Sequence, residues 1–162
     1  MAETRIFEDL IQDHERQRDL LDRIAETSGD SEERRTQFEE LRVELQAHAA
    51  AEEESLYATM LANPDLRDEA RHSVSEHKEV DDMLGELVEM EMSSSGWLTK
   101  FKSMRDRYLH HIDEEEEEMF PAAEKELSDA RKKELIKIFE KEKPKEKAKA
   151  AEEEPSSEEA RD

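Results

Sequence analysis

Apolar residues recur every three or four positions in four successive stretches of the chain, and this periodicity limits the fold more than any other feature. The four stripes run over residues 7–24, 38–56, 66–88 and 97–119. Short runs rich in Ser, Gly, Asn, Asp and Pro, which end helices, separate them. Helices of similar length joined by short turns pack as antiparallel neighbours. The sequence therefore predicts an all-α fold, an up-down-up-down four-helix bundle.

The chain after the fourth stripe changes character. Pro121 ends or kinks the fourth helix, and a short amphipathic stretch over 127–139 predicts one short extra helix. Beyond it, Lys and Glu alternate, and Glu and Ser then dominate to the last residue. Such a segment has too few apolar residues to form a core. We therefore expect a bundle domain over residues 1–140 and a charged, disordered C-terminal tail over 141–162.

The net charge and the absent residue types exclude several classes of function. A formal charge of -22 argues against binding to nucleic acid or to an anionic membrane, because both need a basic surface. No apolar run approaches the roughly 20 residues of a membrane span, and the N-terminus lacks the apolar region of a signal peptide. Without Cys there is no disulfide, thiolate site or Cys nucleophile. We expect a cytoplasmic protein that is a monomer or a weak oligomer.

Four of the six histidines lie on the apolar stripes, one on each predicted helix. They are His14, His48, His77 and His111. A helix of roughly 25 residues is about 37 Å long. Histidines near the middle of four antiparallel helices therefore lie at similar heights, and we expect them to converge inside the bundle.

Two of these histidines are followed four residues later by a carboxylate, in His48-Ala-Ala-Ala-Glu52 and His111-Ile-Asp-Glu-Glu115. Positions four apart share a helix face, so each helix can offer an imidazole and a carboxylate to one centre. Burying these ionisable groups is costly without a charge partner, and a cation supplies one. A shell of imidazoles and carboxylates suits iron, with zinc or manganese as alternatives. The excess of histidine distinguishes it from the carboxylate-rich ferritin-like site.

One motif on each predicted helix contributes to the pattern: Asp13-His14-Glu15, His48-Ala-Ala-Ala-Glu52-Glu-Glu-Ser-Leu-Tyr, Glu76-His77-Lys-Glu-Val-Asp81 and His111-Ile-Asp-Glu-Glu115-Glu-Glu-Glu-Met-Phe-Pro121. Together they resemble the hemerythrin-like family, the HHE cation-binding domain, over about residues 6–139. The resemblance implies an antiparallel four-helix bundle with a non-haem diiron centre. In such a centre Glu52 and Glu115 bridge the two iron ions, the four histidines are terminal ligands, and an oxo or hydroxo group joins the metals.

Members of this family bind dioxygen, sense oxygen or iron, or handle peroxide and nitric oxide. The resemblance thus implies a protein that binds or senses dioxygen or related small oxidants. One alternative is a diiron enzyme of oxidative-stress defence, catalase-like in peroxide disproportionation or acting on nitric oxide. Another is an acidic helical interaction module without catalysis.

One departure from the oxygen carriers of the family concerns the third helix. The carriers have a fifth histidine four residues after the first, where this chain has Asp81 after His77. Fewer ligands leave more open coordination positions, which favours reaction with peroxide or oxygen. Three interpretations of Asp81 stay open: a metal ligand, an acceptor for an imidazole N–H, or a residue facing solvent.

Three other residues near the ligands need an interpretation. Tyr108 lies three residues before His111 on the inner stripe, so it is either a core aromatic or a hydrogen-bond donor to an iron-bound oxygen species. His110 points about 100° away from His111 around the helix, which predicts a boundary or exposed position. His72 lies off its stripe and is predicted to be on the surface.

Overall fold

The computed structural model describes residues 5–152, and its regular elements in that range are all helical. They are α1 (Arg5–Ala25), α2 (Glu32–Glu52), η2 (Glu53–Tyr57), α3 (Ala58–Ala62), α4 (Arg67–Glu89), α5 (Ser95–Glu114), η3 (Glu115–Met119), α6 (Phe120–Glu126) and α7 (Asp129–Glu152). No helix within this range is both long enough and apolar enough to cross a membrane.

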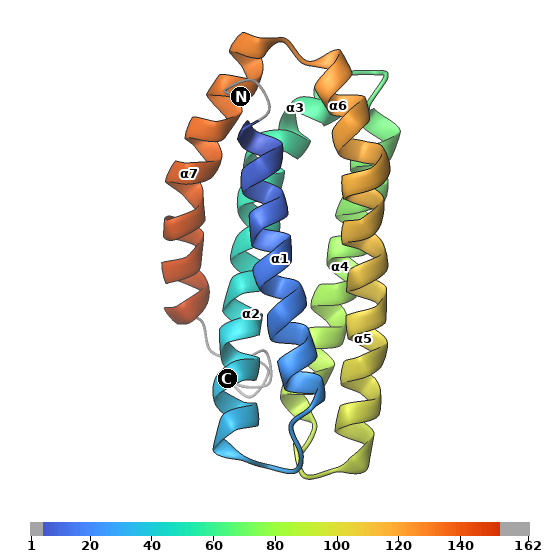
Figure 1. Cartoon of the computed structure of the whole chain (residues 1–162), viewed down its shortest axis with the longest axis vertical. Helices are drawn as coiled ribbons and strands as arrows, with labels where there is room; N and C mark the ends of the chain where they lie inside the picture. The colour runs from blue at the N-terminus through green and yellow to red at the C-terminus, as the bar shows by residue number, and fades with distance from the viewer. Residues whose placement is uncertain (1–4, 153–162) are drawn as a thin grey trace.

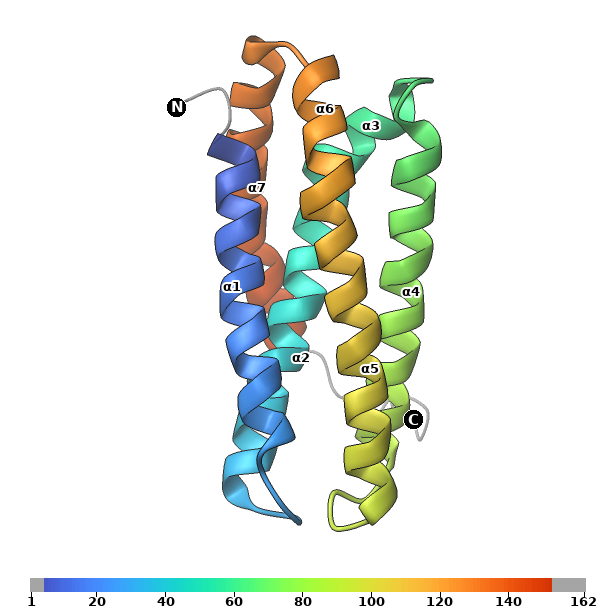
Figure 2. The same cartoon turned by 45° about the vertical axis from the view of Figure 1, so that its right-hand side comes forward.

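Four long rods form the predicted up-down-up-down bundle (Figure 1). Helix α1 is the first rod and α4 the third, while α2, η2 and α3 run on as the second rod and α5, η3 and α6 as the fourth. Figure 2 shows the same antiparallel order from a second side, with α7 beside α1 and α2. The apolar core consists of two clusters, one around Leu10 and Phe120 and the other around Leu21 and Trp97. A layer of histidines and glutamates lies between them.

Arg34 joins the two turns at one end of the bundle. Its side chain is buried, and Nη2 donates a hydrogen bond of 2.7 Å to the Thr27 carbonyl while Nη1 donates one of 2.7 Å to the Met92 carbonyl. Its guanidinium carbon also lies 4.6 Å from the ring centroid of Trp97, a cation–π contact. These contacts link the α1–α2 turn to the α4–α5 turn at this end of the bundle.

The extra C-terminal helix is longer than predicted. The prediction of disorder was wrong for residues 141–152, which belong to the 24-residue helix α7, and residues 153–162 lie outside the described range. Lys and Glu are good helix formers, so their alternation is compatible with a helix that has a surface to pack on. That surface exists: Phe139 is buried in the core, and Lys143 Nζ lies 2.6 Å from Asp13 Oδ2 and 3.1 Å from Glu44 Oε2.

Candidate metal centre

The structure brings together all six residues that the sequence predicted as metal ligands. All six residues are buried, with at most 8% of their surface exposed. They form two groups of four whose ligand atoms all lie within 4.8 Å of one another: His14, His48, Glu52 and Glu115 in one, and Glu52, His77, His111 and Glu115 in the other. Glu52 and Glu115 belong to both groups. This sharing is the arrangement that two bridging carboxylates need.

Each shared carboxylate lies between imidazoles of two helices. Glu52 Oε1 is 3.5 Å from Nε2 of His48 and 3.3 Å from Nε2 of His77. Glu115 Oε1 is 3.2 Å from Nε2 of His14, and its Oε2 is 3.6 Å from Nε2 of His111. The four Nε2 atoms therefore face the two carboxylates at the middle of the bundle.

Most of these facing atoms are buried without a hydrogen-bond partner in residues 5–152. They are Nε2 of His14, His48 and His111, both carboxylate oxygens of Glu52, and Oε1 of Glu115. Buried polar atoms are rarely left unpaired, because their desolvation is then uncompensated. All of them are lone-pair donors, so the donor set fits a cation, and two groups of four fit two cations.

A second ring of carboxylates holds the other nitrogen of each imidazole. The Nδ1 atoms donate to acceptors 2.7–2.9 Å away: His14 to Glu116, His48 to Asp13, His77 to Glu53 and His111 to Glu76. An ionised carboxylate only accepts, so Nδ1 carries a proton, and Nε2 is the nitrogen that can offer a lone pair to a metal at the centre. Sequence analysis did not assign these four acceptors a role, although each one directly precedes or follows a predicted ligand.

The site also repeats along the chain with a spacing of 63 residues. The equivalent pairs are Asp13 and Glu76, His14 and His77, His48 and His111, Glu52 and Glu115, and Glu53 and Glu116. The α1–α2 hairpin and the α4–α5 hairpin therefore contribute matching halves. This spacing is present in the sequence, although the four apolar stripes alone do not reveal it.

Residues 5–123 match the model of the Hemerythrin HHE cation binding domain. The chain belongs to the hemerythrin family. It is also similar to the crystal structure of a hemerythrin HHE cation binding domain-containing protein from Mycobacterium kansasii, with a TM-score of 0.77 and 29% identity over 88% of this chain and 87% of that one. No curated protein matches the chain at a significant level. The family resemblance predicted from the sequence motifs is thus confirmed.

In this hemerythrin bundle, the two rods that carry the shared carboxylates each contain a π-helical turn. Turn η2 begins directly after Glu52, and η3 begins at Glu115. In a π-turn, residues five apart share a face, and such turns are frequent at functional sites. Tyr57 and Phe120, five residues after Glu52 and Glu115, accordingly stack on imidazoles, with ring centroids 5.3 Å from His77 and 6.0 Å from His14.

Tyr57 makes the two halves of the hemerythrin centre unequal. Its side chain is fully buried, and its hydroxyl donates a hydrogen bond to Glu115 Oε2. Phe120, its equivalent in the other half, has no hydroxyl. Tyr57 was not among the site residues predicted from the sequence. Only its place at the end of the second family motif was a signal for it.

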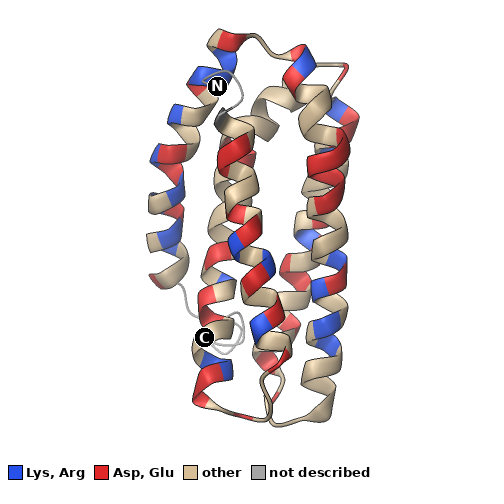
Figure 3. Ribbon diagram, viewed as in Figure 1, with Lys and Arg blue, Asp and Glu red and all other residues tan. Residues whose placement is uncertain are grey.

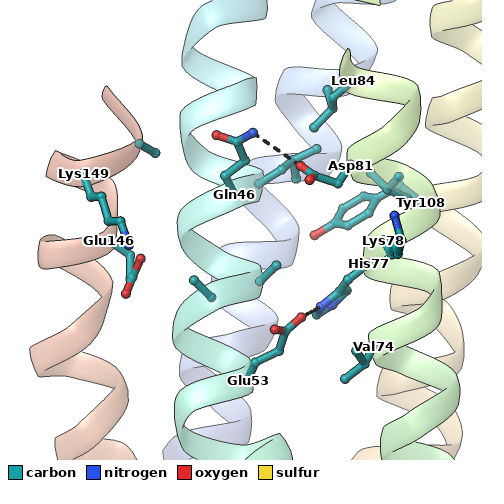
Figure 4. A pocket seen from close by; sticks show the side chains of 15 residues that line it. Gln46, Glu53, Val74, His77, Lys78, Asp81, Leu84, Tyr108, Glu146 and Lys149 are labelled. Atoms are coloured by element: carbon teal, nitrogen blue, oxygen red, sulfur yellow. Dashed lines mark hydrogen bonds and ion pairs between the residues drawn. The ribbon is translucent and has the colours of Figure 1, made fainter. Parts of the chain in front are cut away.

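The other residues singled out in the sequence lie outside the two groups. Tyr108 is buried, and its hydroxyl donates to Gln17 Oε1. Figure 4 shows Asp81 next to Gln46, whose Nε2 donates to it over 3.3 Å, while His77 points to Glu53. Asp81 is exposed and joins neither group. His72 and His110 are exposed, as predicted, with 61% and 66% of their side chains accessible.

The shared carboxylates have opposite pKa shifts in the metal-free protein. Burial raises the pKa of Glu52, but the nearby charges of His48 and His77 outweigh it and lower the pKa below its ordinary value. Burial and the nearby charge of Glu52 raise the pKa of Glu115 well above its ordinary value. Burial lowers the pKa of His77, but the neighbouring carboxylates of Glu52 and Glu53 raise it to about 9. Metal binding at neutral pH must therefore release protons.

We expect the metal-free protein to lose stability when the Asp13 carboxylate is protonated. Burial raises the pKa of Asp13, but the hydrogen bond and charge of His48 and the charge of Lys143 outweigh it, giving a pKa of about 2. Because this folded pKa lies below the ordinary value of 3.8, the stabilisation is present above pH 4 and disappears as the pH falls toward 2. In the Asp13→Asn variant, this pH-dependent contribution to the free energy of unfolding, about 2 kcal/mol, should be absent. Urea unfolding at several pH values measures it.

A suitable control for this pH experiment is Asp19→Asn, since Asp19 lies on the same helix and 61% of its side chain is exposed. This variant should keep the pH dependence of the parent protein. The assignment to Asp13 is wrong if the Asp13→Asn variant loses as much stability between pH 4 and 2 as the parent does.

Proposed function

We propose that the chain is a non-haem diiron protein that binds or senses dioxygen or a related small oxidant. The observation that carries this proposal is the pair of four-residue groups that share Glu52 and Glu115, with their buried lone pairs directed at the middle of the bundle. Imidazole and carboxylate donors suit iron. Two histidines and two shared carboxylates for each ion leave positions free for a small ligand.

The residues around the centre orient its ligands. The four Nδ1 hydrogen bonds fix the rotation of the imidazoles, and the Tyr57 hydroxyl holds one oxygen of Glu115. The two apolar clusters close the bundle above and below the centre. Two iron ions at these donors would supply one electron each and a place for the oxidant to bind.

A pocket of about 520 Å³ gives a small oxidant access to the centre. It opens between α2, α4 and α7 and extends to His77 and Tyr108 (Figure 4). Ala49 and Ala50 line it together with charged residues of both signs. An entrance of mixed charge and apolar surface suits dioxygen or hydrogen peroxide, which carry no charge.

The second candidate function is a diiron enzyme of oxidative-stress defence that disproportionates peroxide or acts on nitric oxide. The position of Asp81 favours it, because this side chain lies at the surface beside Gln46 rather than at the centre. Within residues 5–152, four imidazoles therefore face the centre, and Asp81 adds no fifth ligand. Open positions favour turnover over reversible binding.

The test of both candidates is metal analysis followed by spectroscopy. Protein purified without oxygen should contain two iron ions per chain, and admitting air should change its near-ultraviolet spectrum. His48→Ala should lose most of this iron, while His110→Ala should keep it, since His110 is exposed. A spectrum that reverses under vacuum selects oxygen binding, and peroxide turnover selects the enzyme. Less than one ion per chain after reconstitution would exclude both.

A further inference from the structure

A second group of potential ligands lies on the outside of the bundle, between α4 and α5. His72 Nε2 is 3.2 Å from Glu76 Oε2 and 3.6 Å from Glu114 Oε1, and donor atoms of all three residues lie within 4.8 Å of one another. The side chains of His72 and Glu114 are 61% and 36% exposed. An imidazole and two carboxylates at this spacing can hold a divalent cation that arrives from solvent.

Two of these three residues line a pocket of about 220 Å³. His72 and Glu114 line it together with Glu69, Glu118 and, from the centre, Glu115. Glu115 is only 1% exposed, and its Oε1 has no hydrogen-bond partner within residues 5–152. The pocket therefore extends from the two exposed ligands, His72 and Glu114, to a residue that also belongs to the buried centre.

The charge of this pocket is uniformly acidic. Five of its lining residues are Asp or Glu, and neither Lys nor Arg lines it. Figure 3 shows acidic residues gathered along the upper half of the rod formed by α5, η3 and α6. Burial and the nearby charge of Glu118 raise the pKa of Glu69, which reflects the crowding of negative charge. A pocket lined by negative charge attracts cations and increases their association rate.

The larger pocket has a different chemistry. Lys78 and Lys149 line it beside Glu53, Asp81 and Glu146, so its charges are mixed. A divalent cation is therefore favoured at the acidic pocket, and an uncharged oxidant is compatible with the mixed one. Each pocket is lined by a different residue of the candidate centre, the acidic one by Glu115 and the mixed one by His77.

We propose that His72, Glu76 and Glu114 form an entry site that binds Fe²⁺ from solvent and passes it through the acidic pocket to the buried centre. This inference rests on the proposed function, since it supplies the metal of that centre. Glu76 links the two sites, because its Oε2 faces His72 while its Oε1 accepts a hydrogen bond from His111 Nδ1 over 2.7 Å. The entry site binds weakly, since it has only three ligands and the side chain of His72 is 61% exposed.

The experiment follows the loading of metal-free, full-length protein with Co²⁺, whose visible absorption reports ligation by imidazoles and carboxylates. The double variant H72A/E114Q should load roughly tenfold more slowly than the parent, because the site that concentrates the cation is gone. The final amount bound at the centre should not change. Glu76 stays intact because it holds His111. The single variants H72A and E114Q should each show part of the delay.

Glu142→Gln is the matched control, since it removes one negative charge from an acidic group on another face of the bundle. It should load at the parent rate, which separates a local site from the effect of net charge. The entry-site proposal is overturned if H72A/E114Q loads Co²⁺ at the parent rate. It is also overturned if the variant binds less Co²⁺ at the end of loading, because His72 and Glu114 would then belong to the centre itself. Failure of the parent protein to bind Co²⁺ would instead overturn the proposed function.

Discussion

Replacing Glu115 by Gln is expected to stabilise the metal-free protein and to destabilise the metal-loaded one. Without metal, the carboxyl of Glu115 is buried, and burial and Glu52 raise its pKa well above the ordinary value. A carboxyl whose pKa is raised on folding lowers stability at every pH above its unfolded pKa of 4.5, so the parent loses stability as the pH rises from there. Gln does not titrate, and we expect it to restore about 1–3 kcal/mol at pH 7.

With metal bound, the sign reverses because Gln cannot supply a shared anionic oxygen. A ligand present at 100 times its dissociation constant stabilises the folded state by about 2.7 kcal/mol, and a weaker site loses that contribution. Urea unfolding with a chelator and with excess Zn²⁺ measures both signs. Glu117→Gln, on the same π-turn but exposed, should stay within about 0.5 kcal/mol of the parent in both states. Destabilisation by Glu115→Gln in both states would refute the shared-carboxylate assignment.

The fold and the six predicted ligands were accessible from the sequence because both depend on local geometry. Helical periodicity fixes which residues face inward, and positions four apart, such as His48 and Glu52, share a face wherever the helix lies. The Nδ1 acceptors depend instead on which helices are neighbours. Asp13 directly precedes His14 but holds His48 on α2, so its partner follows from the packing of two helices.

The two tyrosines show a second limit of periodic reasoning. In a regular α-helix, residues five apart point about 140° away from each other, so Tyr57 falls off the face of Glu52. The π-turn η2 returns it to that face, and its hydroxyl reaches Glu115. Tyr108 has the expected spacing from His111, but its hydroxyl goes to Gln17. An α-helical stripe cannot reveal a change of helical period.

Helix α7 was underestimated because its stabilising partners lie far away in the chain. Composition alone suggested a solvated tail from residue 141 onward. Lys143, however, pairs with Asp13 and Glu44, which lie about 100 or more residues earlier. Alternating charge therefore indicates disorder only where no complementary surface exists. Here that surface is formed by Asp13 of α1 and Glu44 of α2, next to the candidate metal centre.

Replacing Phe139 by Ala should weaken both the fold and the centre, and this variant tests the role of α7. Phe139 is 4% exposed in the core cluster that contains Leu135 and Ile6, so its truncation should cost about 3–5 kcal/mol in free energy of unfolding. Its ring centroid also lies 6.1 Å from that of His48. If α7 loosens, this ring contact is lost. Lys143 also moves away from Asp13, the residue that orients His48.

Trp97→Ala separates loss of stability from loss of metal affinity. Trp97 is fully buried in the other core cluster, so its truncation should cost a similar amount of stability. It contacts Phe38 and Phe101 rather than a predicted ligand, and the centre should keep its affinity. Zn²⁺ titration of both folded variants should therefore show weaker binding for Phe139→Ala alone. Equal affinities would mean that α7 stabilises the bundle without supporting His48, because the two variants differ mainly in which cluster they disturb.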